Sequence, residues 1–290
     1  MRIRNSRIGH VGLACLSAVA LVMNASGCGK LVSGANSVPT VKYRPDAAAA
    51  SSTTESTTTA TESATAEAGG VGTLKGKVVV DGAFAALPAL FAKGGATKDP
   101  AVCGAEAIPN ETVLINDGGL ANVFIYLEKA PKGGKSAAAA ESVPFDQKTC
   151  IFLPHAMIVR TNQVVNVLND DAAAHNTHTY PKKNSAFNSV VQPNDRTGVP
   201  LKYSQTEKEP LGVVCDIHPW MQAYHLPLDH SFATISNADG TFEIKDLPAG
   251  KHEFKVWHEV GKMLDKALVV TIKPGDNDIK INVSASKLVK

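Results

Sequence analysis

A cysteine, a histidine and a methionine lie close together in the stretch VVCDIHPWMQAY, residues 213–224. Cys215, His218 and Met221 are spaced i, i+3 and i+6. A thiolate, an imidazole and a thioether are soft-to-borderline metal ligands. Zinc uses the first two readily and has little use for a thioether, whereas copper that changes oxidation state accepts all three. The spacing therefore predicts a copper site that needs one more ligand.

The stretch VVNVLNDDAAAHNTH, residues 164–178, offers that ligand. It places His175 a few residues after an expected strand, with Asn176 directly behind it. Two histidines, one cysteine and a weak axial methionine form the ligand set of a blue copper site. Any one of these residues alone would more simply be core packing or a surface side chain. Their order and spacing together favour a metal site.

Several further histidines lie outside this predicted ligand set. His178, His225 and His230 could form a second metal site, although solvent-facing histidines near a metal site are ordinary. His155 and His258 are expected to be structural.

The elements that must position these ligands read as β-strands. Short runs with alternating apolar residues cover 73–82, 120–130 and 157–170, the last as two strands around a polar turn at 161–163. Residues 232–259 read as a meander and residues 268–283 as a hairpin through Pro274, Gly275 and Asp276. Residues 83–118 and 129–146 are Ala-, Gly- and Lys-rich and are expected to be surface loops. Short strands separated by turn residues predict an all-β sandwich or barrel.

The pattern N-D-x-x-x-x-H-N after a strand, followed by C-x-x-H-P-x-M, resembles the small blue copper proteins, or cupredoxins. The ligand loop is similar to the amicyanin and plastocyanin type, and Pro219 matches its proline. The sequence departs from the family at Val213, where an aromatic residue is frequent, and at 161–165, which lacks the usual Pro-Gly turn. The resemblance implies a Greek-key β-sandwich in residues 144–230.

The resemblance also implies a role for each site residue. His175, Cys215 and His218 would be the strong equatorial copper ligands and Met221 the weak axial one. Around the ligands, Asn176 would tie the two ligand loops together by hydrogen bonds, and Pro219 would stiffen the turn. His218 and Trp220 would form the partly exposed electron-transfer edge.

A second resemblance concerns the flanking segments. GTLKGKVVVDG and ANVFIYL, together with the later D-G-T-F and L-P-A-G, resemble the transthyretin-like β-sandwich of carboxypeptidase regulatory-like modules. Residues 71–130 and 231–290 would be two halves of this module, with the copper domain inserted between them. The alternative is one enlarged cupredoxin-like domain that recruits 120–128 as its first strand. Nothing catalytic is implied by this module.

The N-terminus has the layout of an export signal. MRIRNSR carries three arginines, an apolar run follows from Ile8 to Met23, and small residues lead to Cys28. This end resembles the lipobox of bacterial lipoproteins, except that Ala25 stands where leucine is usual. Residues 1–28 would then be a signal with lipidation at Cys28, and ordinary signal cleavage or a single membrane anchor are the alternatives. Residues 29–70, largely Ala, Ser, Thr and Glu, are expected to be a disordered linker.

The remaining cysteines form an odd set in an exported protein, where a spare thiol is a liability. Beyond Cys15 and Cys28, the chain has Cys103, Cys150 and Cys215. The simplest assignment is a Cys103–Cys150 disulfide, which leaves Cys215 for the metal. Other pairings remain open at the level of sequence.

Composition and motifs narrow the function. The net charge is +2 and no basic run is present, which argues against nucleic-acid binding. The sequence has no His-x-His pair for a multicopper enzyme and no G-x-S-x-G or C-x-x-C-H motif, so we expect no enzyme. The expected function is that of an exported, membrane-anchored copper protein that carries one electron to or from a partner protein. The alternative is a copper-binding or cell-surface interaction lipoprotein without redox turnover.

Overall fold

The computed structural model describes residues 69–289 of the chain. The predicted signal, its lipidation site Cys28 and nearly all of the predicted linker lie outside the described residues, so they stay predictions. Within the described part the protein is all-β, with one short helix, α1 (Pro100–Cys103), and a terminal 3₁₀ turn, η1 (Ala285–Leu288). No helix in residues 69–289 is long and apolar enough to cross a membrane.

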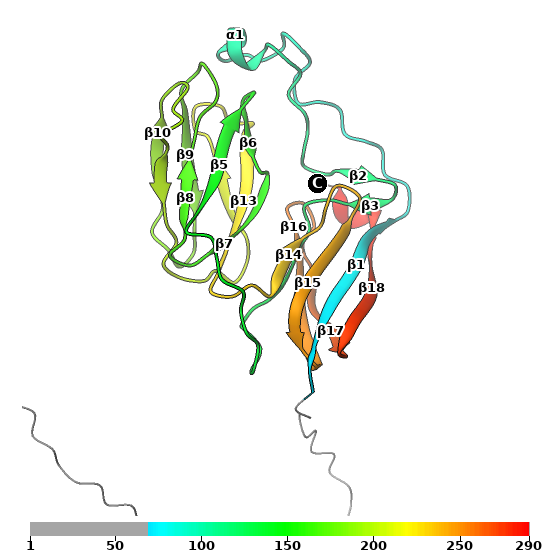
Figure 1. Ribbon diagram of the computed structural model, residues 1–290. Coiled ribbons are helices and arrows are strands. Elements are labelled where there is room, and N and C mark those ends of the chain that lie inside the picture. The colour runs from blue at the N-terminus through cyan, green and yellow to red at the C-terminus, as the bar shows by residue number, and fades with distance from the viewer. Residues whose placement is uncertain (1–68, 290) are drawn as a thin grey trace, which may run out of the picture. The chain divides into compact units, whose positions relative to one another are not determined.

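Four sheets form two β-sandwiches (Figure 1). We call the first the central sandwich, because it uses the middle of the chain, residues 142–228. One of its sheets has the order β10-β9-β12-β13-β7 and the other β11-β8-β5-β6. Its strands are β5 (Ser142–Lys148), β6 (Ile151–Leu153), β7 (Ala156–Arg160), β8 (Val164–Val167), β9 (His175–Tyr180), β10 (Asn188–Val191), β11 (Val199–Leu201), β12 (Leu211–Val214) and β13 (Gln222–Leu228).

The second, the split sandwich, is built from segments on both sides of the central one. One sheet has the order β15-β1-β3-β2, with β18 parallel to β1, and the other has the order β14-β4-β16-β17. Its strands are β1 (Val71–Asp81), β2 (Ile115–Asn116), β3 (Gly119–Leu120), β4 (Phe124–Leu127), β14 (Ala233–Ile235), β15 (Thr241–Pro248), β16 (Gly250–His258), β17 (Lys262–Ile272) and β18 (Gly275–Ser284). The assignment of the two sandwiches to separate domains stays a prediction.

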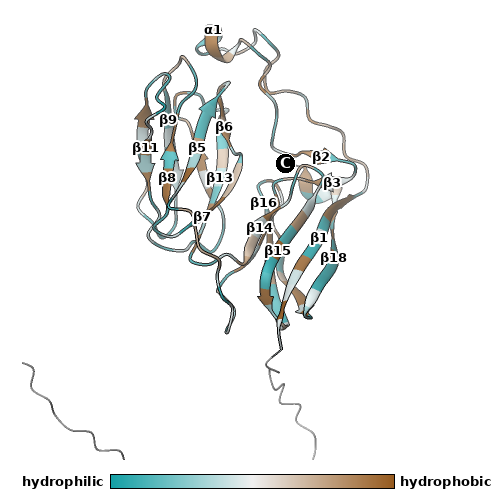
Figure 2. Cartoon of the chain, viewed as in Figure 1, coloured by the Kyte–Doolittle hydropathy of each residue, from teal (hydrophilic) through white to brown (hydrophobic). Residues whose placement is uncertain are grey.

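Each sandwich has its own apolar core. In the central sandwich Phe145 and Val165 of one sheet face Val159 and Val213 of the other. Along β12 buried and half-buried residues alternate, as expected for a strand with one face toward a core. In the split sandwich strands carry both hydrophilic and hydrophobic residues along their length (Figure 2). The two-residue period thus decides which side chains enter each core.

Strand β4 is buried on both faces, which explains its continuous apolar sequence. Ile125 and Leu127 belong to the core of the split sandwich. Phe124 and Tyr126 point the other way, into a small apolar cluster with Leu226 of the central sandwich. This strand pairs with β14 and β16, so it belongs to the split sandwich by its hydrogen bonds.

Two local predictions are wrong. Residues 232–259 are not a meander, because β15 pairs with β1 whereas β14 and β16 pair with β4. Residues 268–283 are not a hairpin, because β17 pairs with β16 and β18 pairs with β1. In both cases a tight turn carries the chain from one sheet to the other. A turn motif fixes a reversal of direction, but tertiary packing decides which strands pair.

The predicted surface loops also differ from the structure. Residues 83–118 contain α1 and the β-bridge between Phe91 and Ile108, and Ile108 is buried in the core of the central sandwich. Residues 129–146 include the start of β5, whose Phe145 is fully buried. Small residues such as alanine and glycine gave these segments a loop-like composition although part of each packs against the sheets.

Candidate metal centre

Three adjacent strands position the predicted ligands. His175 is the first residue of β9, Cys215 follows β12, and Met221 precedes β13. Strand β12 pairs with both β9 and β13, so these strand ends lie side by side. The turn from 215 to 221 is closed by backbone bonds from the Cys215 N–H to the Met221 carbonyl (3.2 Å) and from the Met221 N–H to the His218 carbonyl (2.9 Å).

The structure brings the side chains of His175, Cys215 and His218 together. Their ligand atoms all lie within 4.8 Å of one another. The two Nδ1 atoms of the histidines are 2.9 Å apart, and the Cys215 Sγ is 3.8 Å from the His218 Nδ1. All three residues are buried, with 0% to 1% of their surface exposed. One sulfur and two ring nitrogens therefore converge on one point beneath the surface.

The far nitrogen of each ring is held by a carboxylate. The His175 Nε2 lies 2.9 Å from Asp171 Oδ2, and the His218 Nε2 lies 2.8 Å from Asp99 Oδ2. A carboxylate accepts the Nε2 proton and so leaves Nδ1 with a free lone pair. Two such lone pairs beside a thiol sulfur need a positive charge between them. The donor set thus fits a soft-to-borderline metal ion, and its residues fit copper.

In the metal-free state a proton takes the place of the cation. Burial alone would raise the pKa of the Cys215 thiol, but the neighbouring imidazoles of His175 and His218 lower it to about 6. Burial alone would lower the pKa of His175, but the carboxylate of Asp171 and the nearby sulfur of Cys215 raise it to about 9. A thiolate and an imidazolium therefore share the site near neutral pH, and a metal must displace the imidazolium proton to bind.

Asn176 links the two segments that carry the ligands. Its N–H lies 3.4 Å from Cys215 Sγ, and its Oδ1 accepts the N–H of Asp216 at 2.7 Å. Its Nδ2 donates to Asp216 Oδ2 at 2.8 Å. The role that the resemblance implies for Asn176 at a copper site stays a prediction. The bonds hold β9 and the turn after β12 at a fixed separation.

The rest of the turn packs against neighbouring segments. Met221 is buried in the core of the central sandwich, and Pro219 is exposed. The Trp220 ring makes edge contacts with Phe91 and His218, and its Nε1 donates to the Cys150 carbonyl. The prediction that His218 is a partly exposed edge is wrong, because its ring is fully buried. Asp99 bonds the Nε2 of His218, and Trp220, which itself contacts Phe91, packs against the ring; sequence patterns gave no sign of these contacts.

The two carboxylates, Asp171 and Asp99, were not predicted from the sequence. Asp171 also accepts the backbone N–H groups of Thr149 and Cys150, at 2.7 and 2.8 Å. Its position four residues before His175, in a segment rich in small residues, was an available signal. Asp99 is far from the ligands in sequence and carried no signal of its own.

Cys103 and Cys150 form a disulfide with their Cα atoms 5.3 Å apart, which is the pairing that cysteine arithmetic favoured. Among the described residues Cys215 is the free cysteine. Cys150, Asp171 and His175 also lie close together, but the sulfur of Cys150 is used by the disulfide.

The other histidines are not gathered into a second ligand set within residues 69–289. His178 binds Asp216, and His225 is buried beside the hydroxyl of Tyr203. His155 lies between the carboxylates of Glu259 and Glu111. Because Glu259 directly follows β16, this ion pair links the central sandwich to the split sandwich.

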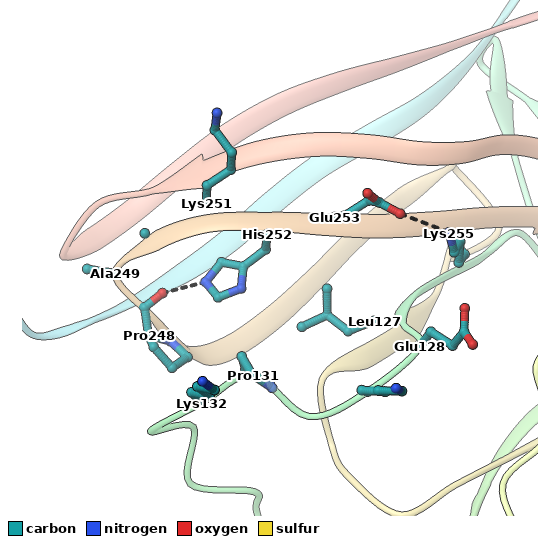
Figure 3. Close-up of a pocket in the computed structure, with 12 residues that line it drawn as sticks. Leu127, Glu128, Pro131, Lys132, Pro248, Ala249, Lys251, His252, Glu253 and Lys255 are labelled. Carbon is teal, nitrogen blue, oxygen red and sulfur yellow. Dashed lines mark hydrogen bonds and ion pairs between the residues drawn. The ribbon is translucent and has the colours of Figure 1, made fainter. Parts of the chain in front are cut away.

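A pocket lies elsewhere, in the split sandwich at the turn between β15 and β16. It has a volume of about 570 Å³ and lies beside Leu127, Lys132 and His252 (Figure 3). The ring of His252 bonds the Pro248 carbonyl at 2.7 Å, and Lys255 pairs with Glu253. His252 and Lys255 thus have partners within the pocket, and none of its residues belongs to the ligand cluster described above.

Comparisons with known proteins place cupredoxins among the structural neighbours. No protein-family model matches the chain, and no curated protein is similar to it in sequence. A mutant of amicyanin in its reduced Cu(I) form is 15% identical with a TM-score of 0.27, over 37% of this chain and 99% of that one. The purple cupredoxin of Nitrosopumilus maritimus is 15% identical with a TM-score of 0.25, over 31% and 100%.

A copper-containing nitrite reductase from Thermus scotoductus is 13% identical with a TM-score of 0.27. The match covers 32% of this chain and 25% of the nitrite reductase, so the chain spans about a quarter of that protein. Similarity of this extent does not establish an activity for this chain.

Proposed function

We propose that this protein is a type 1 copper protein that carries one electron outside the cytoplasm. The observation that supports this is the convergence of His175 Nδ1, His218 Nδ1 and Cys215 Sγ in a buried site. In the proposal these three groups and the Met221 thioether hold one copper ion. Bound copper would supply a one-electron redox couple.

The protein's own residues would keep this site the same in both redox states. Asp171 fixes the ring of His175 through its Nε2, and Asn176 fixes the separation of the two ligand segments. The strands β9, β12 and β13 anchor the ligands at their ends. A site whose ligands cannot move has little to rearrange when an electron arrives or leaves.

The cellular setting is part of the proposal. The export signal and the cysteine at position 28 support an exported lipoprotein held at a membrane by a lipid. A low-complexity segment between Cys28 and β1 would let the folded part reach a redox partner protein. We propose that the split sandwich is a regulatory-like module with a binding or structural role, since it presents no ligand set of its own in the described residues.

One observation favours a second candidate, a copper-binding lipoprotein without redox turnover. The His218 ring, which the first candidate would use as an electron-transfer edge, is fully buried. A closed edge suits retention of copper better than rapid electron exchange with a partner protein.

The decisive measurement is the visible spectrum and voltammetry of the copper-loaded protein. We expect an intense thiolate-to-copper band and a reversible one-electron wave, both lost in Cys215→Ala. The matched control is His178→Ala, since His178 lies three residues from His175 on the same strand but bonds Asp216; this variant should keep both signals. A blue band without a reversible wave would favour the second candidate. A colourless protein that prefers zinc would reject both.

A further inference from the structure

Residues 90–108 form a closed loop over the candidate metal centre, which we call the cap. Its two ends are joined at the bridge between Phe91 and Ile108, where the Leu90 N–H donates to the Ile108 carbonyl and the Ile108 N–H to the Phe91 carbonyl, both at 2.9 Å. Higher in the loop the Gly94 N–H donates to the Gly104 carbonyl at 2.8 Å. The cap is therefore a defined substructure.

The cap is fastened to the central sandwich in three ways. Cys103 is linked to Cys150 by the disulfide. Ala96, Cys103 and Ile108 are buried in the core of that sandwich. The Phe91 ring makes an edge contact with Trp220, with 5.0 Å between the ring centres. A covalent link and burial of this kind hold a loop of this length in one place.

Asp99 is the residue of the cap that reaches the metal centre. Its backbone is left-handed, with φ at 45°, a conformation that aspartate tolerates better than most residues. Its carbonyl accepts the N–H groups of Val102 and Cys103, which fixes the turn of α1. An aspartate before a helix commonly caps it with its side chain, but this carboxylate does not. It accepts the His218 Nε2 proton instead, at 2.8 Å.

We propose that the cap is a built-in cover for the copper site, and that Asp99 is a positioning residue for His218. By taking the Nε2 proton, Asp99 leaves Nδ1 as the free nitrogen and turns it toward His175 and Cys215. The cover also closes the ring edge of His218 to solvent, chelators and partner proteins. The cap and the role of Asp99 toward the His218 ring are argued from contacts among the protein's own residues. Only the role toward copper rests on the proposed function.

The first test is the tautomer of His218 in the full-length, metal-free protein, read from the ¹⁵N shifts of its ring. We expect the Nε2–H form in the wild type, a mixture of forms in Asp99→Gly, and retention of the Nε2–H form in Asp99→Asn. Glycine accepts the left-handed backbone without strain, and asparagine keeps an acceptor oxygen. Glu106→Gln is the matched control, because Glu106 lies on the cap but pairs with Lys93 at the surface. An unchanged tautomer in Asp99→Gly would overturn the positioning role.

The second test is the copper-loaded protein in the presence of a chelator. Loss of a residue that orients a metal-bound histidine typically weakens metal affinity by about 10- to 100-fold. We therefore expect copper release at least about tenfold faster in Asp99→Gly than in the wild type or Glu106→Gln. Equal release rates would overturn the role of Asp99 toward the metal. A protein that binds no copper would reject the proposed function, while the tautomer test would still decide the role of Asp99.

The third test opens the cover without touching Asp99. The double variant Cys103→Ser, Cys150→Ser removes the disulfide. In the metal-free protein, the rate at which Cys215 is alkylated is measured by mass spectrometry of the peptide that carries it. We expect alkylation to be at least about tenfold faster than in the wild type, because exposure controls thiol reactivity. Circular dichroism and thermal unfolding check that the variant is folded. Unchanged alkylation in the folded variant would overturn the cover.

Discussion

The two sandwiches have similar layers of β-sheet but bury very different side chains. The core of the split sandwich consists of valine, leucine, isoleucine and phenylalanine. The core of the central sandwich also contains three cysteines, two methionines and a tyrosine, and buried polar residues such as Asp171, His175 and Asn176 lie beside it. Buried polar groups are costly unless each finds a partner, whereas apolar groups need only to be packed. Two sandwiches of similar architecture therefore differ in what their interiors can bind, because only the central one buries thiol, imidazole and carboxylate groups together.

The largest expected effect tests the apolar core alone. Phe254 is fully buried in the split sandwich, and truncation to alanine should cost about 3–5 kcal/mol of unfolding free energy. Denaturant unfolding measures this loss. The copper signal of the folded fraction should be unchanged, because Phe254 belongs to a different core from the ligands. If folded Phe254→Ala lost that signal, the separation of the two cores would be wrong.

The next effect concerns the junction of the two sandwiches. Burial alone would lower the pKa of His155, but Glu111 and Glu259 raise it to about 9. Protonated His155 therefore stabilises the folded state fully below pH 6.5, and this stability is lost as the pH rises through about 9. The loss should be on the order of 3 kcal/mol. Unfolding free energies between pH 6 and pH 10 measure it.

His155→Gln is the control for this dependence, since glutamine cannot be protonated. The variant should be less stable at neutral pH and should lose little further stability at high pH. An alkaline loss of equal size in the variant would assign the dependence to other groups.

A smaller effect tests a partner of the central site. Asp171→Asn removes the charge that holds the His175 Nε2 but keeps a similar shape. We expect copper affinity to fall about 10- to 100-fold, since partners of this kind tune metal binding to that extent. Competition with a coloured chelator measures it. Asp170→Asn is the control, because Asp170 pairs with Lys148 at the surface, and an equal fall in that variant would contradict the role of Asp171.

The smallest effect is expected at the surface of the split sandwich. Lys75 and Asp276 form an exposed ion pair at 2.7 Å. Exposed pairs contribute little because water and salt screen them. Lys75→Ala should change neither the unfolding midpoint nor the copper signal by a measurable amount. A clear loss of either would show that this sheet is coupled to the site.

Much of the strand content could be read from the sequence, because alternation of apolar residues is local. Alternation predicted β1 and the pair β7 and β8. The turn between β12 and β13 was indicated instead by the spacing of Cys215, His218 and Met221. Pairing could not be read in the same way. The segments β17 and β18 look like a hairpin, yet they belong to different sheets. A turn residue reports the local backbone, whereas pairing depends on which surfaces pack.

The candidate site, too, has features that local sequence predicted and features that only tertiary packing decided. The sequence by itself predicted that His175, Cys215 and His218 lie together, because their order and spacing are local features of two strand ends and one turn, and the structure brings their ligand atoms within 4.8 Å of one another. Cysteine arithmetic favoured Cys103 and Cys150 as the disulfide pair, and the structure confirms that pairing. Only the tertiary structure brought Asp99 to His218 and the cap over the ring, because a contact between residues so far apart in sequence exists only after the chain has folded. Exposure of the site was therefore decided by packing, and the residue types alone could not reveal it.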